Sequence, residues 1–261
     1  MTSLLLLAAG ASKRFGRPKQ LEPVGPHGET IMDITMRHAF ASGCDRVVLV
    51  IRPEHEALFM GKSGADARVR FAVQPEAFGT GHAVMIGLEQ AVGTTVIANA
   101  DDFYGYPAIT DAFAHASTQG EEHALIAFTL ANTLSAAGPV HRALCTIDAN
   151  GFLTFTEEHK GLRAGTGNRV LDADGATHDP ATLVSMNLWV LRPGIAPYFH
   201  TAVKHFNAQG QRGECMLPAV VQLAMDNGHR VRVRRTDARW AGLTYAADAD
   251  LVRRTLAEGN T

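Results

Sequence analysis

The stretch "LLLLAAGASKRFGRPKQL", residues 4–21, joins an apolar run to a loop that carries four cations. A short, continuous apolar run is typical of a strand buried on both faces of a parallel sheet. The loop begins at Gly10, and a glycine after a strand lets backbone N–H groups come close to an anion. Arg14 offers phosphate oxygens a fork of donors, while Lys19 offers a compact charge. These residues alone leave a solvated basic loop as the alternative.

The first hundred residues alternate between segments typical of strands and segments typical of helices. After the first run, strands are predicted at 46–51, 69–73 and 95–98, and helices at 30–42, 53–60 and 79–91. This alternation predicts an α/β, Rossmann-like fold with a mixed, mainly parallel sheet and helices on both faces. Ligands of such sheets bind beyond the carboxyl ends of the strands. The loops 10–19, 74–81 and 99–104 should therefore share one rim.

The second half of the chain is richer in predicted strands. They lie at 122–130, 143–148, 152–157, 183–191 and 230–234, with helices at 194–207, 217–227 and 248–257. We see no internal repeat, linker or low-complexity stretch, so the simplest organisation is one domain, 1–261, whose two halves share a cleft.

Composition and charge exclude several classes of protein. The 261 residues are 46% hydrophobic, which excludes global disorder, and the net charge of −2 gives no field that attracts nucleic acid or an anionic membrane. Three cysteines without CxxC spacing predict reduced thiols in a cytoplasmic protein. The chain start lacks the basic residues of a signal peptide, and no apolar segment approaches the ~18 residues of a membrane span. The sequence leaves open whether the protein forms a homo-oligomer.

The opening stretch resembles a known signature. "LAAGASKRFGRPK", residues 7–19, is similar to the L-A-A-G-x-S-x-R-x-G-x-x-K motif of nucleotidyltransferases that make sugar nucleotides. The resemblance implies their glycosyltransferase-A-like fold and a loop that wraps a nucleoside triphosphate. It implies nucleotide-binding roles for Ala8, Ala9 and Gly10, and catalytic roles for Arg14 and Lys19.

Lys13 and Arg17 fall at variable positions of the motif. We expect these two side chains to be solvated.

A second stretch suggests which base is bound. "QPEAFGTGHA", residues 74–83, looks like the Q-x-E-x-L-G-T-G-H-A segment of bacterial N-acetylglucosamine-1-phosphate uridylyltransferases. The resemblance implies that Gln74, Gly79 and Thr80 bind the nucleotide base. A glutamine amide both donates and accepts, as a uracil or thymine edge requires, so UTP or dTTP is favoured. The alternative is that Gly79 and Thr80 only start a helix, with Thr80 as its cap.

A third stretch, "ANADDFYG" at residues 98–105, lies where the family carries an aspartate that binds magnesium. Asp101 aligns best with it, and the neighbouring Asp102 is the alternative. Mg²⁺ takes few carboxylates when phosphates and waters complete its shell, so one or two acids are enough. Without a metal, one aspartate would serve a turn.

The second metal ligand of the family falls at Thr244, whose hydroxyl is a weak ligand for Mg²⁺. Either Thr244 acts through water, or Asp248 or Asp237 replaces it, or a single carboxylate serves.

The resemblance also implies sugar contacts in the second half, at Gly138, Glu157 and Asn187. Lys160 and Arg142 are candidates for the phosphate of the sugar. Gly138 could instead be a turn residue, Asn187 could be satisfied at a strand edge, and the alignment of Glu157 is uncertain by one position. On this interpretation residues 1–105 form a nucleotide-binding half and 106–261 a sugar-phosphate-binding half.

Other polar signals predict no site. The twelve histidines show no H-x-x-x-H pair with a supporting acid. Asp172 and Asp174 are expected in a surface turn.

Together these patterns predict an Mg²⁺-dependent enzyme that transfers a nucleoside monophosphate from an NTP to a sugar 1-phosphate and releases pyrophosphate. The alternatives are a cytidylyl- or guanylyltransferase acting on a non-sugar phosphate, and a non-catalytic sugar-nucleotide sensor on the same fold.

Overall fold

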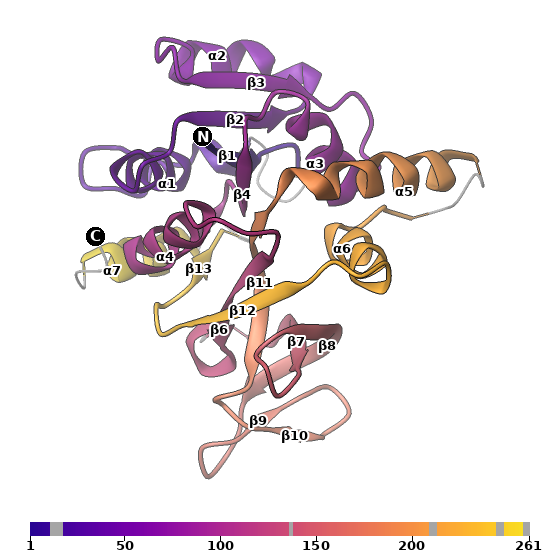
Figure 1. The fold of residues 1–261 in the computed structure, drawn as a ribbon. Helices are drawn as coiled ribbons and strands as arrows, with labels where there is room; N and C mark the ends of the chain where they lie inside the picture. The colour runs from indigo at the N-terminus through magenta and orange to yellow at the C-terminus, as the bar shows by residue number, and fades with distance from the viewer. Residues whose placement is uncertain (11–17, 136–137, 209–212, 244–247, 258–261) are drawn as a thin grey trace.

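The computed structural model describes residues 1–10, 18–135, 138–208, 213–243 and 248–257. Among these residues, eleven strands form one mixed sheet, which runs from β3 to the β9–β10 hairpin (Figure 1). Its parallel part consists of β1 (Thr2–Leu7), β2 (Arg46–Ile51), β3 (Val69–Val73) and β4 (Thr94–Asn99), in the order β4-β1-β2-β3.

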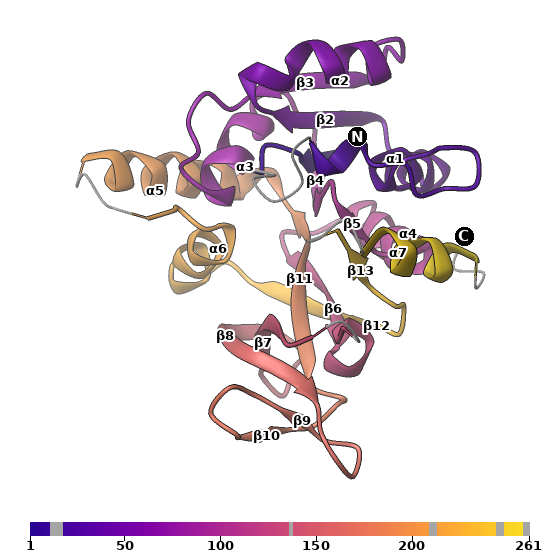
Figure 2. The same cartoon turned by 180° about the vertical axis from the view of Figure 1, so that it is seen from behind.

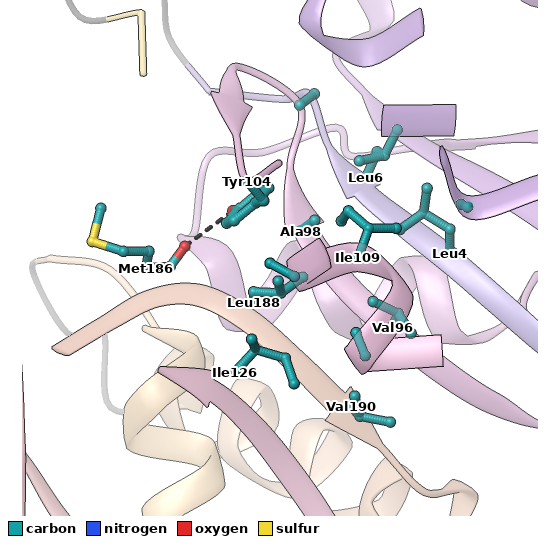
Figure 3. Close-up of a cluster of buried hydrophobic side chains, with 14 of the residues drawn as sticks. Leu4, Leu6, Val96, Ala98, Tyr104, Ile109, Ile126, Met186, Leu188 and Val190 are labelled. Carbon is teal, nitrogen blue, oxygen red and sulfur yellow. Dashed lines mark hydrogen bonds between the residues drawn. The ribbon is translucent and has the colours of Figure 1, made fainter. Parts of the chain in front are cut away.

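Strand β1 lies in the middle of this parallel part, and all six of its residues are buried. Because side chains alternate along a strand, Leu4 and Leu6 enter one core cluster while Leu5 and Leu7 enter another. Figure 3 shows the first cluster, where Leu4 and Leu6 lie with side chains of β4 and β11. The expected strand buried on both faces is confirmed.

Helices cover both faces of the sheet, as expected. Side chains of α1 (Ile31–Ala41), α2 (Glu56–Ser63) and α4 (Tyr106–Ala116) join the cluster of Leu4. Side chains of α3 (Thr80–Leu88), α5 (Ala196–Ala208) and α6 (Leu217–Asp226) join the cluster of Leu5. Helix α4 was not predicted, although Pro107 in its first turn and its buried apolar face are ordinary helix signals.

The second half extends the same sheet with mostly antiparallel strands. Strand β11 (Leu183–Leu191) pairs with β4, and beyond it follow β7 (Val140–Ile147), β8 (Leu153–Ala164), β9 (Val170–Leu171) and β10 (Thr177–His178). Strand β6 (His123–Thr129) also pairs with β11 and carries β12 (Val231–Thr236). Strands β8, β9 and β10 form an arm at the end opposite β3 (Figures 1 and 2).

Two short strands bring the end of the chain back to the parallel part. Strand β13 (Ala241–Gly242) pairs antiparallel with β5 (Asp102–Phe103), which follows β4. Helix α7 (Asp248–Ala257) then packs Ala249, Val252 and Leu256 into a third apolar cluster. In the described part of the chain, no helix is long and apolar enough to cross a membrane.

Candidate active site

The three predicted loops meet at the carboxyl ends of the parallel strands. Ala8 N donates to Val50 O at 2.8 Å, and Ala100 N donates to Leu7 O at 3.1 Å. Gln74 N donates to Ile51 O at 2.8 Å. These bonds place the segments after β1, β3 and β4 on the shared rim that the strand order predicts.

The first of these loops is described only at its two ends. Ala8 and Ala9 are buried and Gly10 is exposed. Arg14, with Lys13 and Arg17, lies outside the described residues. The predicted role of Arg14 therefore stays a prediction.

Lys19 and Asp101 form an ion pair across the rim. Lys19 Nζ also donates to Leu243 O at 2.8 Å, so one ammonium group joins three segments of the chain. The side chains of Lys19 and Asp101 are 21% and 16% exposed, which leaves the pair accessible while partly removed from water. A charge-assisted contact in such surroundings is stronger than one on the open surface.

Asp102, the next residue after Asp101, is buried. Its Oδ2 accepts from Asn99 Nδ2 at 2.8 Å. Burial, and then the carboxylate of Asp101, raise the pKa of Asp102 above its usual range. Two adjacent carboxylates, one of them desolvated, favour a bound cation, and their oxygens are the ligands that Mg²⁺ prefers.

Tyr104 connects this acidic pair to β11. Its hydroxyl accepts from Asn99 N at 3.0 Å and donates to Met186 O at 3.0 Å (Figure 3). The ring of Tyr104 is buried. The connection fixes the position of β11 relative to the end of β4.

The segment that precedes Thr244 contacts the aspartates directly. Leu243 N donates to Asp101 O at 3.0 Å. A Cβ on Gly242 would lie 2.7 Å from Asp102 Oδ1 and 2.5 Å from the Trp240 ring, so a side chain at position 242 would have to displace both of them. Thr244 itself lies outside the described residues.

The two replacements considered for Thr244 differ in their surroundings. Asp248 begins α7. Asp237 has a side chain that is 80% exposed and pairs with Arg235 at 3.1 Å. The identity of a second metal ligand stays a prediction.

Arg142 is close enough to Asp102 for their charges to interact. Its guanidinium donates to Thr133 O through Nε at 3.1 Å and through Nη2, and it stacks 4.7 Å from the Trp240 ring centroid. Burial lowers the pKa of Arg142 to about 10, and the charge of Asp102 opposes this shift. Arg142 is thus a partly desolvated cation suited to an anionic group.

Asn187 has an unusual backbone conformation. Its φ is 61°, in the left-handed region that non-glycine residues rarely adopt, and it lies in a β-bulge between Ser185 and Trp189. Its Oδ1 accepts from Trp189 Nε1 at 3.4 Å, so the side chain is in part satisfied within its own strand. The preceding residue, Met186, accepts the Tyr104 bond. Strain of this kind clusters at functional sites.

The remaining predicted sugar-phosphate residues have no hydrogen bond or ion pair to the acidic pair within the described ranges. Gly138 forms an isolated bridge with Ser135, with open space where a Cβ would stand. Glu157 is 67% exposed and lies 3.4 Å from His159 Nε2. Lys160 is exposed. The structure does not join these three residues to the rim.

The segment expected to bind the base is bonded to the segment before α6. Gly81 N donates to Cys215 O at 2.7 Å, and Cys215 N donates to Phe78 O at 2.7 Å. Gly79 has a φ of 98°, and a Cβ there would lie 2.6 Å from Cys215 O. Glycine at 79 is therefore required by the fold itself.

Thr80 does not cap its own helix, because the N-cap of α3 is Gly79. The Thr80 hydroxyl instead accepts from Leu217 N, at the first residue of α6, at 2.9 Å. The cap alternative is wrong in that form, since the hydroxyl serves another helix.

The Gln74 side chain is buried, and among the residues that the structure describes only the nitrogen of its amide has polar contacts. Its Nε2 donates to Gly79 O at 3.2 Å and lies 3.3 Å from His82 Nδ1. Within the described residues its Oε1 has no hydrogen-bond partner. The carbonyl oxygen is therefore the part of this amide available to a ligand.

Two buried donors near the rim were missed from the sequence. Gln20 Nε2 has no hydrogen-bond partner among the described residues and lies 3.8 Å from a Cβ built on Gly10. Trp240 Nε1, next to Gly242, is likewise unpartnered in that part of the chain. Buried donors are normally satisfied, so both suggest a ligand group beside them. The one sequence feature that could have identified Gln20 as a site residue is its position directly after Lys19.

Comparisons with known proteins agree with this geometry. A MobA-like NTP transferase domain model matches residues 4–166. The bifunctional protein GlmU of Burkholderia multivorans is 27% identical over 261 residues, covering 95% of this chain and 50% of the relative. GlmU of Rhodococcus jostii is 27% identical over 241 residues, covering 87% of this chain and 44% of the relative. The chain thus spans about half the length of these curated relatives.

A solved structure shares the fold. The inositol-1-phosphate CTP transferase of T. maritima superposes with a TM-score of 0.67 at 16% sequence identity, over 99% of this chain and 97% of that one. The expected nucleotidyltransferase-like α/β fold is confirmed. With more than half of its residues matched by the domain model, this chain belongs to the family of MobA-like NTP transferase domains.

Proposed function

We propose that this protein transfers a nucleoside monophosphate from an NTP to a sugar 1-phosphate and releases pyrophosphate, with UTP or dTTP as the favoured nucleotide. The observation that carries the proposal is the cluster of Lys19, Asp101 and Asp102 on the rim after β1 and β4. The similarity to GlmU, which covers 95% of this chain, supports the proposal. In this proposal the chain is one domain, with nucleotide bound mainly by residues 1–105 and sugar phosphate by 106–261.

The reaction needs positioning and charge neutralisation more than proton transfer. The attacking oxygen belongs to a phosphate that is already anionic, so no general base is required. Lys19 and Arg14 would hold the triphosphate and stabilise the departing pyrophosphate, while Arg142 would hold the phosphate of the acceptor. Holding two anions in line can lower the barrier by ~7–11 kcal/mol.

The acidic pair fits a divalent cation. Asp101, with Asp102 as the alternative, would hold Mg²⁺, and Thr244 or Asp248 would complete the site. When bound, Mg²⁺ offsets the charge between the two phosphate groups. Lys19, which contacts both Asp101 and Leu243, would hold its ammonium group beside the metal and the phosphates.

The choice of base depends on Gln74. Its free Oε1 can accept from N3–H of uracil or thymine, which supports UTP or dTTP. The amino group of cytosine could donate to the same oxygen, and for that reason a cytidylyltransferase acting on a non-sugar phosphate is the second candidate.

The experiment measures pyrophosphate release from purified protein with Mg²⁺. UTP, dTTP, CTP, GTP and ATP are each combined with a panel of sugar 1-phosphates and non-sugar phosphates. We expect turnover with UTP or dTTP and a sugar 1-phosphate. Turnover with CTP and a non-sugar phosphate would select the second candidate. Nucleotide binding without pyrophosphate release in any combination would identify a sensor and end the proposal.

A further inference from the structure

A second polar cluster lies on the β8–β10 arm, away from the rim. His178 Nε2 lies 2.9 Å from Asp172 Oδ2, and His159 Nδ1 lies 3.8 Å from the same oxygen. The side chains of Asp172, His178 and His159 are 9%, 14% and 25% exposed. One donor atom from each residue lies within 4.8 Å of the other two. The three residues come from β8, the turn after β9, and β10.

The turn between β9 and β10 fixes the carboxylate. Asp172 Oδ1 accepts from Asp174 N at 3.0 Å and from Ala176 N at 2.8 Å, as expected of a turn aspartate. These bonds orient Oδ2 toward the two imidazoles. The expectation that Asp172 serves a turn is correct for one oxygen and incomplete for the other.

Strand β8 is held close against this turn. Ala173 N donates to Lys160 O at 2.9 Å. Gly161 has a φ of 69°, and a Cβ there would lie 2.8 Å from the Ala173 Cβ. A glycine at 161 allows the approach that brings His159 to Asp172.

A second carboxylate lies near His159. The Nε2 of His159 lies 3.4 Å from Glu157 Oε2, and its Nδ1 lies on the side of Asp172. Histidines that bind metals generally donate their other N–H to a carboxylate, and Glu157 is within reach of that nitrogen. An ordinary Asp–His hydrogen bond explains His178 but gives no role to this orientation of His159.

The spacing of the donor atoms fits a small cation. With Zn–N and Zn–O bonds of ~2.0–2.1 Å, neighbouring ligand atoms of a tetrahedral site lie about 3.3 Å apart. The distances from Asp172 Oδ2, 2.9 and 3.8 Å, lie on either side of this value, and the three donor atoms all lie within 4.8 Å of one another. Two imidazoles and one carboxylate suit Zn²⁺ and related transition metals, whereas Mg²⁺ prefers an all-oxygen shell.

We propose that His159, Asp172 and His178 bind one divalent transition-metal cation of the Zn²⁺ class, which fastens the β9–β10 hairpin to β8. The fourth position is left to water or another ligand. This site is separate from the acidic pair on the rim and does not depend on the proposed transferase activity.

The test uses the full chain without a histidine tag, stripped by a chelator and titrated with Zn²⁺ against a chromophoric competitor. We expect one ion per chain with micromolar or tighter affinity, and four-coordinate d–d bands when Co²⁺ replaces Zn²⁺. His159→Ala, His178→Ala and Asp172→Asn should each weaken binding by at least about 10²-fold. Glu157→Gln should weaken it by about 10–100-fold.

The controls are His200→Ala and His205→Ala, two exposed histidines on α5, which should leave the affinity unchanged. Asp172→Asn keeps an oxygen for the two turn N–H groups, and circular dichroism checks its fold. If this variant does not fold, His178→Ala decides, because no backbone group depends on that ring in the described residues.

A second readout is hydrogen exchange in residues 170–178. Zn²⁺ should slow it in the wild-type chain and not in His178→Ala. Absence of stoichiometric binding by the wild type at micromolar Zn²⁺ would overturn the proposal. Equal losses in the α5 controls, or full displacement of Zn²⁺ by millimolar Mg²⁺, would do so as well.

Discussion

At the rim of the sheet, Lys19 contacts two groups that lie more than eighty positions away in the sequence. It pairs with Asp101 after β4 and donates to Leu243 beside β13. The same ammonium could exchange Asp101 for a phosphate oxygen when a nucleotide binds. Loss of the Lys19 ammonium would then remove a cation from the reaction and, in the protein without ligand, the contact that joins Asp101 to Leu243.

We expect Lys19→Ala to lower kcat for pyrophosphate release by on the order of 10²–10³, because a preorganised cation would no longer stabilise the charge that develops on the phosphates. Arg14→Ala should have a comparable effect. The control is Lys62→Ala. Lys62 lies on α2 and forms an ion pair with Asp33 of α1. Near-normal turnover of either the Lys19 or the Arg14 variant would contradict the proposed mechanism.

Asn187 allows backbone strain to be separated from side-chain function. Asn187→Gly tolerates the φ of 61° but removes the acceptor of the buried Trp189 Nε1–H, so the free energy of unfolding should fall by about 1–3 kcal/mol. If the amide contacts the sugar, KM for the sugar phosphate should rise about tenfold or more while KM for the NTP stays constant. Urea unfolding and steady-state kinetics measure the two effects. Unchanged KM values would remove Asn187 from the site.

At the scale of elements, the segment 78–81 at the start of α3 and the segment 214–217 before α6 hold each other in place. The sequence pattern indicated a base-binding loop, and the structure adds a packing role to the same residues. Both readings fit Gly79, since a glycine at this position keeps the chain close to Cys215 and leaves room for a base.

Gly79→Ala should destabilise the protein by more than ~2 kcal/mol, because strain at a positive φ adds to a contact with the Cys215 carbonyl. The matched control is Gly43→Ala, where φ is 89° and a Cβ would meet no atom within 4 Å. That control should cost only about 1 kcal/mol. Urea unfolding of both variants measures the difference, and equal losses would show that the contact with Cys215 is unimportant.

At the scale of the whole molecule, acid should destabilise the fold through buried histidines. Burial lowers the pKa of His38 and of His123 from 6.5 to about 4. Between these values the unfolded chain binds more protons than the folded chain, so the stability present above pH 6.5 is lost as the pH falls toward 4. Each unit of pKa difference is worth about 1.4 kcal/mol.

His38→Phe tests this pH dependence, because the new ring can keep the edge contact that His38 makes with Tyr106. The free energy of unfolding of the variant should fall less steeply between pH 6.5 and 4 than that of the wild type. Exposed His200→Ala should retain the wild-type slope. Parallel curves for His38→Phe and the wild type would show that His38 does not titrate as its burial implies.

The sequence predicted best the features that depend on neighbouring residues. The apolar run of β1, the alternation of strands and helices, and the turn role of Asp172 are local, and the structure confirms them. Helix α4 was missed although its signals are equally local. The strand β8 extends to Ala164, seven positions beyond its predicted end, because pairing with β7 and β9 continues where the sequence becomes polar.

The sequence by itself determined the α/β fold and the rim where its loops meet, because strand burial and helix periodicity depend on short stretches of neighbouring residues. Only the tertiary structure decided that Leu243 lies against Asp101, that Asn187 occupies a strained bulge, and that His159 faces Asp172. Each of these depends on close approach between distant segments, where backbone sterics and burial, rather than residue order, decide which groups meet.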